Sequence, residues 1–463
     1  MTELKRDLGI WAAVSIVIGT VIGSGIFRVP QTMTQSVGSV GMVFVVWVVG
    51  GILTMAGALT YAELAAMLPG AGGEYVYLTE AYGPMWGFLY GWTQMWVAKS
   101  GSIATLATAF FEYSGNFWPE LEHVFFHIPL PLGEHGAPLG VSYGQIFAIG
   151  VILLLGVVNY FGVKVGGDVQ VVVTVIKVAL IAFIILAGIL HGNTAETHAA
   201  IPTSGTTAVS GFFVALVAAL WAYDGWNNVG MVASEIKNPQ RNLPRSLIAG
   251  SLAVMAIYLL ANIAYFLVLS PAMVAGHKLV AAEMMLRIQG QSGANWVSLA
   301  AMISIFAALN GSILTGARVP YAMARDGIFF RPVSRVHPRF HTPGVAILAL
   351  SGWSAILVLS GRYDQLYTYV IFASWILYAM ATASVIVLRK KRPDLPRPYR
   401  TIGYPIVPVL FVATAILLEV FTLKDSPRES ISGIVLILLG LPFYFYWKRQ
   451  STPASSDYLA ASD

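Results

Sequence analysis

The sequence predicts an all-α integral membrane protein with about twelve transmembrane helices and with both termini in the cytoplasm. Three observations support this fold class. The 463 residues are 57% hydrophobic and 11% charged, with a mean hydropathy of +0.72, whereas soluble domains contain about a quarter charged residues. The chain divides into about twelve apolar runs long enough to cross a bilayer. Most Lys and Arg residues fall in the segments predicted to face the cytoplasm.

The composition also excludes several classes of site. The chain has no cysteine, which rules out disulfide scaffolds, thiol catalysis and cysteine metal sites. A net charge of +5 could indicate a nucleic-acid partner, but the basic residues lie mainly in short loops between apolar runs. We therefore expect the lipid bilayer and a small molecule as partners, no nucleic acid, and neither cofactor nor metal.

Loop-like stretches such as "MLPGAGGEYVYL" and "IKNPQRNLPRS" separate the apolar runs. The predicted organisation is a cytoplasmic N-terminal segment at 1–7, a five-helix repeat at 8–193, a second and inverted five-helix repeat at 194–392, helices eleven and twelve at 393–449, and a cytoplasmic tail at 450–463.

Two of the apolar runs carry polar, glycine-containing interruptions at mid-depth. The first run, from Leu8 to Thr34, contains "VIGSGIFRVP", and we predict a break in this helix at 23–26. The sixth run contains "YDGWN", which predicts a break at 222–226. The interruptions are five spans apart, an odd number, so the second unit enters the membrane from the opposite side. Interrupted helices in corresponding positions are typical of inverted-repeat transporters.

Such breaks free backbone N–H and C=O groups inside the membrane, where they must face protein, water or a ligand. A half-helix that starts at the first break directs its N–H groups and positive dipole end at the cavity, which suits a carboxylate. Free carbonyls at the second break suit an ammonium group. The pair predicts a receptor for an amino acid zwitterion. The alternative is that the glycines only allow close helix packing.

Four stretches carry a resemblance to a known family. "IGTVIGSGIFRVP" resembles the first-helix signature of the amino acid–polyamine–organocation (APC) superfamily, and "LWAYDGWNNVGMVASEIKNPQRNLPRSL" resembles the sixth-helix signature of its L-type amino acid transporter branch. "YAELAAMLPGAGGEYVYL" and "ALNGSILTGARVPYAMARDG" are further matches. The chain is similar to bacterial members of that branch, which implies a LeuT-like 5+5 inverted repeat plus two C-terminal helices in a bacterial inner membrane. Mammalian members pair with a glycoprotein through a disulfide, so without cysteine we expect no disulfide-linked heavy chain and a functional monomer.

The resemblance also implies roles for individual residues. The N–H groups of Ser24, Gly25 and Ile26 would bind the substrate carboxylate, and the carbonyls of Trp221, Ala222 and Asp224 would bind its amine. Trp221 would also close the site from outside, although a core or lipid-facing aromatic side chain is the alternative. Three further residues complete the predicted substrate-binding set: Ile22, Gly23 and Gly225.

Three charged residues fall deep within predicted spans. Lys177 lies about ten residues into the fifth span, where a lysine costs about 3 kcal/mol on insertion scales. In relatives a lysine here occupies the place of a sodium ion, and we expect Lys177 to bind carbonyls around Gly23; a purely stabilising pair is the alternative. Asp224 either attracts a substrate ammonium or basic side chain, or caps a half-helix that begins at Gly225. Lys99 is expected to pair within the bundle.

The predicted function is a secondary transporter that moves L-amino acids across the plasma membrane by alternating access. Neutral substrates are expected, and cationic substrates are a further option because Asp224 could attract a basic side chain. Sodium-independent exchange is favoured over proton-coupled symport. A channel or an integral membrane enzyme is the alternative from another class. Against an enzyme, the eight histidines are scattered, and the spacing of His123 and His127 matches no zinc motif known to us.

Overall fold

The computed structural model describes residues 4–128, 139–192, 208–359, 363–425 and 427–450. Most of the predicted C-terminal tail (451–463) and the start of the predicted second repeat (194–207) lie outside these ranges. Within them, nine helical stretches are long and apolar enough to cross a membrane. They are residues 10–37, 40–67, 143–160, 163–191, 239–268, 291–325, 371–391, 406–424 and 430–450.

The predicted count of twelve spans stays a prediction. Two apolar helices are shorter than a full crossing, namely α9 (Ala208–Tyr223, 16 residues) and α16 (Gly344–Val358, 15 residues). The expected third span is one helical stretch from Pro84 to Ser114 that carries Lys99 and several hydroxyl side chains. An integral membrane protein built of helices is what the structure supports.

The elements that precede the second interrupted segment are α1 (Ile10–Val21), α2 (Gly25–Val37), α3 (Val40–Met67), α4 (Glu74–Tyr82), α5 (Pro84–Thr93), the π-helical turn η1 (Gln94–Ala98), α6 (Lys99–Ser114), the 3-10 turn η2 (Pro119–Glu122), the strands β1 (Val124–Ile128) and β2 (Leu139–Ser142), α7 (Tyr143–Tyr160) and α8 (Val163–His191).

The later elements are α9, α10 (Asn228–Met231), the 3-10 turn η5 (Ala233–Glu235), α11 (Pro239–Val268), α12 (Pro271–Gly276), α13 (Val280–Gln289), α14 (Gln291–Gly316), α15 (Arg318–Arg325), the 3-10 turn η6 (Arg331–Ser334), α16, α17 (Tyr363–Lys391), α18 (Ile406–Asp425), α19 (Pro427–Leu438) and α20 (Gly440–Gln450).

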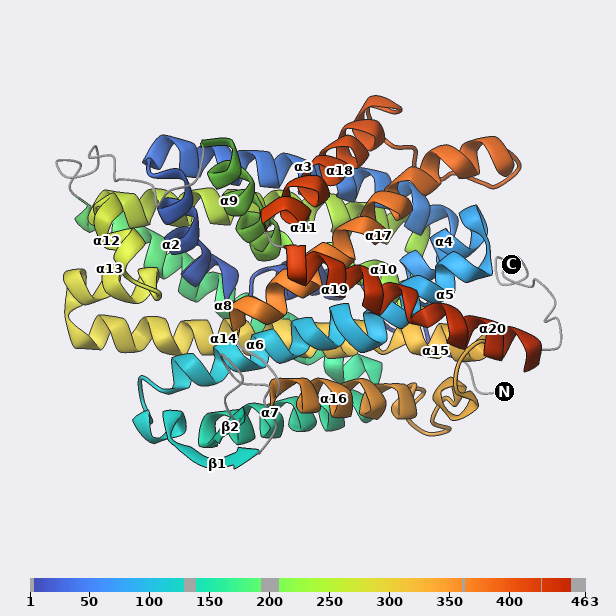
Figure 1. The fold of residues 1–463 in the computed structure, drawn as a ribbon, viewed down its shortest axis with the longest axis horizontal. Coiled ribbons are helices and arrows are strands. Elements are labelled where there is room, and N and C mark those ends of the chain that lie inside the picture. Colours follow the sequence, from blue (N-terminus) through green and yellow to red (C-terminus); the bar gives the residue numbers. More distant parts are fainter. Residues whose placement is uncertain (1–3, 129–138, 193–207, 360–362, 426, 451–463) are drawn as a thin grey trace.

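The long helices run roughly along the longest axis of the molecule, and α20, the last helix that the structure describes, lies toward one end of it (Figure 1). Helices α4 and α15 lie toward that end, whereas α12 and α13 lie at the opposite end. Which side of the bundle faces the cytoplasm stays a prediction.

The centre of the bundle is built around α1, which contacts α8, α11 and α14. The two interrupted segments cross-pack: α2 lies against α9, and α1 contacts α10. Each half of the first segment thus meets the opposite half of the sixth. This antiparallel pairing is what an inverted repeat produces.

Local sequence explains how polar side chains fit in these apolar helices. Hydroxyl groups donate to the carbonyl one turn earlier, as Thr54 does to Gly50 at 2.9 Å and Thr93 does to Leu89 at 2.8 Å. At the start of α7, Ser142 and Gln145 form a reciprocal capping box. Such bonds satisfy the hydrogen-bonding capacity of polar groups, which lipid could not do.

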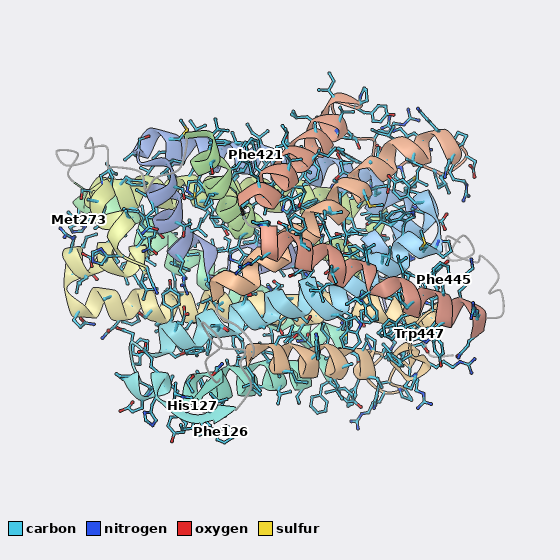
Figure 2. The ribbon with its side chains drawn as sticks, viewed as in Figure 1. Phe126, His127, Met273, Phe421, Phe445 and Trp447 are labelled. Carbon is cyan, nitrogen blue, oxygen red and sulfur yellow. The ribbon has the colours of Figure 1, made fainter. Side chains whose placement is uncertain are left out.

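The strands β1 and β2 form a small antiparallel hairpin beside α7. Figure 2 places Phe126 and His127 of this hairpin at the rim of the molecule, directed away from the helices, and Phe126 is 55% exposed. The hairpin is therefore peripheral and contributes nothing to the centre of the bundle.

Candidate functional site

The first segment is interrupted between Val21, where α1 ends, and Gly25, where α2 begins. The break therefore spans residues 22–24, one residue earlier at its start than the expected 23–26. The N–H group of Gly23 donates to the carbonyl of Val21 at 2.8 Å in a tight turn. Gly25 and Ile26 form the first turn of α2, where backbone N–H groups have no partner within the helix.

The sixth segment is interrupted between Tyr223, where α9 ends, and Asn228, where α10 begins. Gly225 has a φ of +101°, a left-handed conformation that a side chain would strain. The break thus covers 224–227 rather than the expected 222–226, because the chain turns at Gly225 and resumes its helix three residues later. Asp224 lies four residues before α10, so it is not the N-cap of that helix.

The two breaks are joined directly. The hydroxyl of Thr20 donates to the carbonyl of Gly225 at 2.9 Å. The hydroxyl of Tyr258 on α11 lies 3.0 Å from the carbonyl oxygen of Val21 and 2.7 Å from that of Ala222. The backbones approach so closely that a Cβ on Gly25 would lie 2.7 Å from the Cα of Ala222. Packing and hydrogen bonding therefore hold the breaks as one unit.

A narrow cavity opens between the breaks, with about 330 Å³ of space between atoms, its mouth included. Its wall is formed by Thr20, Val21, Gly23, Ser24, Gly25, Ser102, Leu106, Trp221, Asp224, Gly225, Asn228 and Ser312.

The structure places most, but not all, of the predicted site residues in this wall. The cavity wall includes Gly23, Ser24, Gly25, Trp221, Asp224 and Gly225, whereas Ile22, Ile26 and Ala222 are outside it. The carbonyl of Ala222 already accepts the Tyr258 hydroxyl, and that of Ile22 faces Lys177. On α14, the hydroxyl residue Ser312 also reaches the cavity. Thr315 instead bonds to Gly311 at 2.8 Å.

Lys177 on α8 is completely buried against the first break. Its ammonium donates to the carbonyls of Gly19 at 2.8 Å and Ser304 at 3.1 Å, and also to that of Ile22. An ammonium has three N–H donors, so these three carbonyls satisfy it. Two of the partners, Gly19 and Ile22, lie just before Gly23, where carbonyl partners were expected, whereas Ser304 lies on α14.

The second break is held through its side chains. The hydroxyl of Tyr378 on α17 donates to Asp224 Oδ1 at 3.0 Å. Asn227 donates to the carboxylate of Glu74. The ammonium of Lys99 donates to Asn228 Oδ1 at 2.6 Å, so Lys99 does pair within the bundle. Lys99 directly follows the π-helical turn η1, and such turns occur frequently at functional sites.

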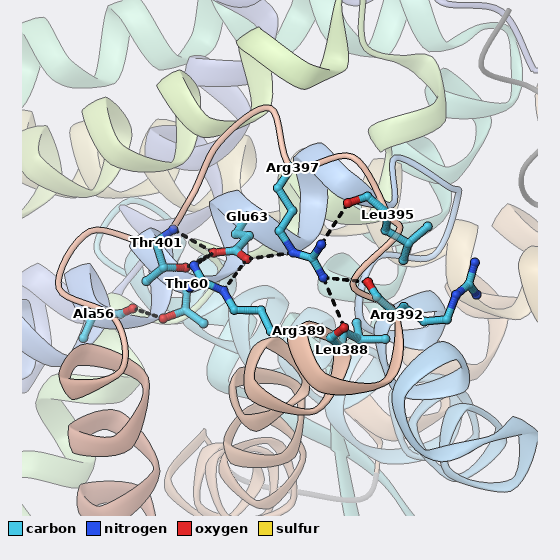
Figure 3. A network of polar contacts seen from close by, with 9 residues as sticks. All are labelled: Ala56, Thr60, Glu63, Leu388, Arg389, Arg392, Leu395, Arg397 and Thr401. Atoms are coloured by element: carbon cyan, nitrogen blue, oxygen red, sulfur yellow. Dashed lines mark hydrogen bonds and ion pairs between the residues drawn. The ribbon is translucent and has the colours of Figure 1, made fainter.

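A second polar network joins the C-terminal end of α3 to that of α17 (Figure 3). Glu63 on α3 accepts from Arg389 on α17 at 2.9 and 2.7 Å, and from the N–H and hydroxyl of Thr401 at 2.7 and 2.8 Å. Arg397 lies 3.6 Å from the same carboxylate. This network connects α3, α17 and the loop after α17, as a structural anchor would.

Sequence analysis missed several residues around the breaks, namely Thr20, Glu74, Tyr258 and Ser304. The hydroxyl residues gave no signal, because Thr, Tyr and Ser are common in apolar helices. Glu74 had a weak one: it is a lone carboxylate directly after "GAGG" and before the apolar "YVYL". Among the described residues, no group of three His, Asp or Glu side chains could hold a metal ion.

Comparison with known proteins decides the family. The family model described as amino acid permease matches residues 8–441. The chain belongs to the amino acid permease family. This confirms the predicted membership of the APC superfamily and its L-type branch.

Its relatives in this family are similar over nearly their whole length. The serine/threonine exchanger SteT of Bacillus subtilis is 34% identical, with 96% of this chain and 98% of that protein covered. The human b(0,+)-type amino acid transporter 1 is 33% identical, with 96% and 88% covered. The human cystine/glutamate transporter is 30% identical, with 96% and 85% covered. Family membership and the apolar helices identify a multi-pass membrane protein of amino acid transport.

Proposed function

We propose that this chain is a secondary transporter that exchanges L-amino acids across a bacterial inner membrane by alternating access. The observation that carries the proposal is the cavity enclosed by both interrupted helices, with Ser24 and Gly25 on one wall and Trp221 and Asp224 on the other. The names of its relatives, which include a serine/threonine exchanger, support exchange as the mode of transport.

The substrate carboxylate binds at the start of α2, where the N–H groups of Ser24, Gly25 and Ile26 and the positive end of the helix dipole converge. The substrate amine binds at the end of α9, near the carbonyls of Trp221, Ala222 and Asp224. The Ala222 carbonyl can still accept a second bond beside that from Tyr258, because a carbonyl oxygen has two lone pairs. Trp221, which is 6% exposed at the cavity wall, closes the site from outside.

Exchange proceeds without sodium because the ammonium of Lys177 supplies a fixed positive charge beside the first break. Its three carbonyl partners leave little room for a second cation at the same place. The substrates are neutral amino acids, and Asp224 extends the range to those with basic side chains. We further propose that the protein works as a monomer. A disulfide-linked heavy chain is not part of the proposal, since the sequence contains no cysteine.

The test is counterflow in proteoliposomes. Labelled amino acid outside should accumulate when unlabelled amino acid is present inside, and accumulation should be unchanged when choline replaces sodium. A panel of neutral and basic amino acids defines the range, and a pH gradient without internal amino acid tests the proton-coupled alternative. Uptake that needs sodium would contradict the role given to Lys177, and absence of any counterflow would contradict exchange.

A further inference from the structure

Glu74, the first residue of α4, is a fully buried carboxylate with one hydrogen-bonded side-chain partner. Its Oε1 accepts from the amide of Asn227 in the second break. Its Oε2 has no hydrogen-bond partner in the part of the chain that the structure describes. Leaving a buried carboxylate oxygen unsatisfied is costly. The environment of Glu74 therefore does not suit an ionised carboxylate.

The surroundings of Glu74 are rich in polar groups that lack partners. The hydroxyls of Tyr61, Tyr77 and Tyr90 are buried, and none makes a hydrogen bond within the described residues. The Glu74 carboxyl is near enough to act electrostatically on all three, and the Tyr90 hydroxyl lies within reach of the carboxyl. The Tyr90 hydroxyl can donate to an ionised carboxyl or accept from a protonated one, so this neighbour allows Glu74 to gain and to lose a proton.

The charges around the second break do not balance. Glu74 and Asp224 are two carboxylates, and Lys99 is the ammonium that acts on both; Tyr378 faces them from α17. With every group ionised, the cluster would carry one net negative charge in the interior. One carboxylate must therefore take up a proton or meet another cation.

The two carboxylates have unequal environments, and these decide which one is protonated. Asp224 reaches the cavity, accepts from the Tyr378 hydroxyl at 3.0 Å and interacts with the Gly225 N–H and Lys99.

Glu74 lies on α4, outside the nine candidate crossings of the described residues, and is fully buried and absent from the cavity wall. The donors within its reach are the Asn227 amide, the Tyr90 hydroxyl and its own N–H. Its interaction with Lys99 is weaker than that of Asp224. Burial raises the pKa of the Glu74 carboxyl. When environments separate the pKa values of neighbouring acids, the less solvated acid holds the proton.

We propose that Glu74 is a proton-binding site, filled while α10 is docked against the start of α4 and emptied to water when α10 moves away. Docking here means the bond from the N–H of Gly72 to the carbonyl of Met231 at 2.9 Å, together with the Asn227–Glu74 contact. On undocking, the O–H bond at Oε2 breaks, a water molecule receives the proton, and a solvated carboxylate remains. The inference rests on the proposed function, because alternating access is what moves α10.

The effect of pH on the docking of α10 has a defined direction. The pKa of Glu74 is raised in the docked state and returns toward its ordinary value when water reaches it. Below that ordinary pKa, both states are protonated and pH has no effect. As the pH rises from there toward the raised pKa, the docked state loses stability relative to the undocked state, by at most about tenfold per pH unit. Alkaline pH on the side of the bundle where α4 lies should therefore favour undocking.

A cysteine reporter can measure undocking, because the chain has no cysteine of its own. Met231 at the end of α10 is fully buried, so the thiol of Met231→Cys becomes accessible when α10 moves away. Labelling rates with an impermeant maleimide are compared between pH 5.5 and 8 with Glu74 intact and with Glu74→Gln. At each pH, the labelling rate with Glu74 intact is divided by the rate with Glu74→Gln. This labelling ratio cancels the pH dependence of the thiol itself.

We expect the labelling ratio to rise with pH, because glutamine mimics the protonated acid and cannot titrate. Glu80→Gln is the matched control, since Glu80 lies on the same helix but pairs with Arg392 at 3.4 Å, away from the break; it should keep the rise. The same pH profile with Glu74 intact and with Glu74→Gln, which gives a flat ratio, would overturn the proposal.

A second variant covers the case in which Glu74→Gln does not fold. Asn227→Ala removes the donor that favours the ionised form of Glu74, so the rise in labelling should extend to higher pH. An unshifted profile would overturn the proton site. Counterflow is measured on the same proteoliposomes: its absence contradicts the transport function, whereas counterflow with a flat labelling ratio contradicts the proton site alone.

Discussion

The two interrupted helices face the same cavity, yet they are held in different ways. The first break is held through its main chain: Lys177 binds the carbonyls of Gly19 and Ile22, and Ser304 donates to Ile22 at 3.0 Å. The second break is held mainly through its own side chains, since Asp224, Asn227 and Asn228 contact Tyr378, Glu74 and Lys99, although Thr20 also donates to the carbonyl of Gly225. Neighbouring helices thus bind the main chain of the first break but chiefly the side chains of the second.

Because of this difference, we expect substitutions to affect the two breaks differently. Carbonyl groups cannot be removed by changing a side chain, so the first break is sensitive mainly to the residues that bind it from α8 and α14. The second break is sensitive to its own residues, because each contributes a separate contact. Four substitutions test this contrast, and they follow from the largest expected effect to the smallest.

Lys177→Met should have the largest effect, because it removes the cation that binds three carbonyls. Removing one partner from a buried charged contact costs about 3–5 kcal/mol, which corresponds to a loss of exchange of more than about a hundredfold. Initial rates of counterflow provide the measurement. Lys164→Met is the matched control, because Lys164 is on the same helix but exposed, and it should leave exchange intact. Equal loss of exchange in both variants would contradict the conclusion that Lys177 holds the first break in place.

Gly225→Ala should have the next largest effect, through strain at the second break. An alanine at a φ of +101° costs on the order of 1–3 kcal/mol, so both the thermal unfolding midpoint and the counterflow rate should fall. Gly352→Ala on α16 is the control, since its Cβ would meet nothing within 4 Å. A fully active Gly225→Ala variant would show that this break does not need its left-handed turn.

The positions of both breaks could be predicted from sequence, because glycine and polar residues in an apolar run weaken a helix wherever the fold places it. Lys177 could also be assigned a class of partner, since a buried ammonium needs acceptors and carbonyls near a break are available. The family signatures predicted membership of the amino acid permease family, which the family match confirms. These predictions depend on local backbone physics or on long sequence matches.

The partners of the second break could not be predicted in the same way. Glu74 meets Asn227 across 153 positions of sequence, and Tyr258 reaches both breaks only because of how α11 is rotated. Such contacts depend on helix rotation and packing, which a single sequence does not encode locally. The start of α10 was also misplaced: the expected helix began at Gly225, whereas the turn there delays it to Asn228.

Asp224→Asn tests whether the charge at the second break selects substrates. The amide oxygen can still accept from Tyr378, so the break should persist, while a basic side chain loses its charged partner. A hydrogen bond to a charged group contributes about 1.5–3 kcal/mol, so competition by basic amino acids should weaken about tenfold or more relative to neutral ones. Inhibition constants from counterflow measure this ratio. Equal weakening for both classes would assign Asp224 a purely structural role.

Ser304→Ala should have the smallest effect, although its hydroxyl touches the same carbonyl as Lys177. The ammonium still binds Ile22 after the substitution, so only one neutral hydrogen bond is lost, at a cost of about 1 kcal/mol. Counterflow should slow by about fivefold. Ser354→Ala is the control, because its hydroxyl bonds within its own helix, to Leu350 at 2.8 Å. If Ser304→Ala were as damaging as Lys177→Met, the first break would depend on the geometry of α14 rather than on the positive charge that α8 supplies.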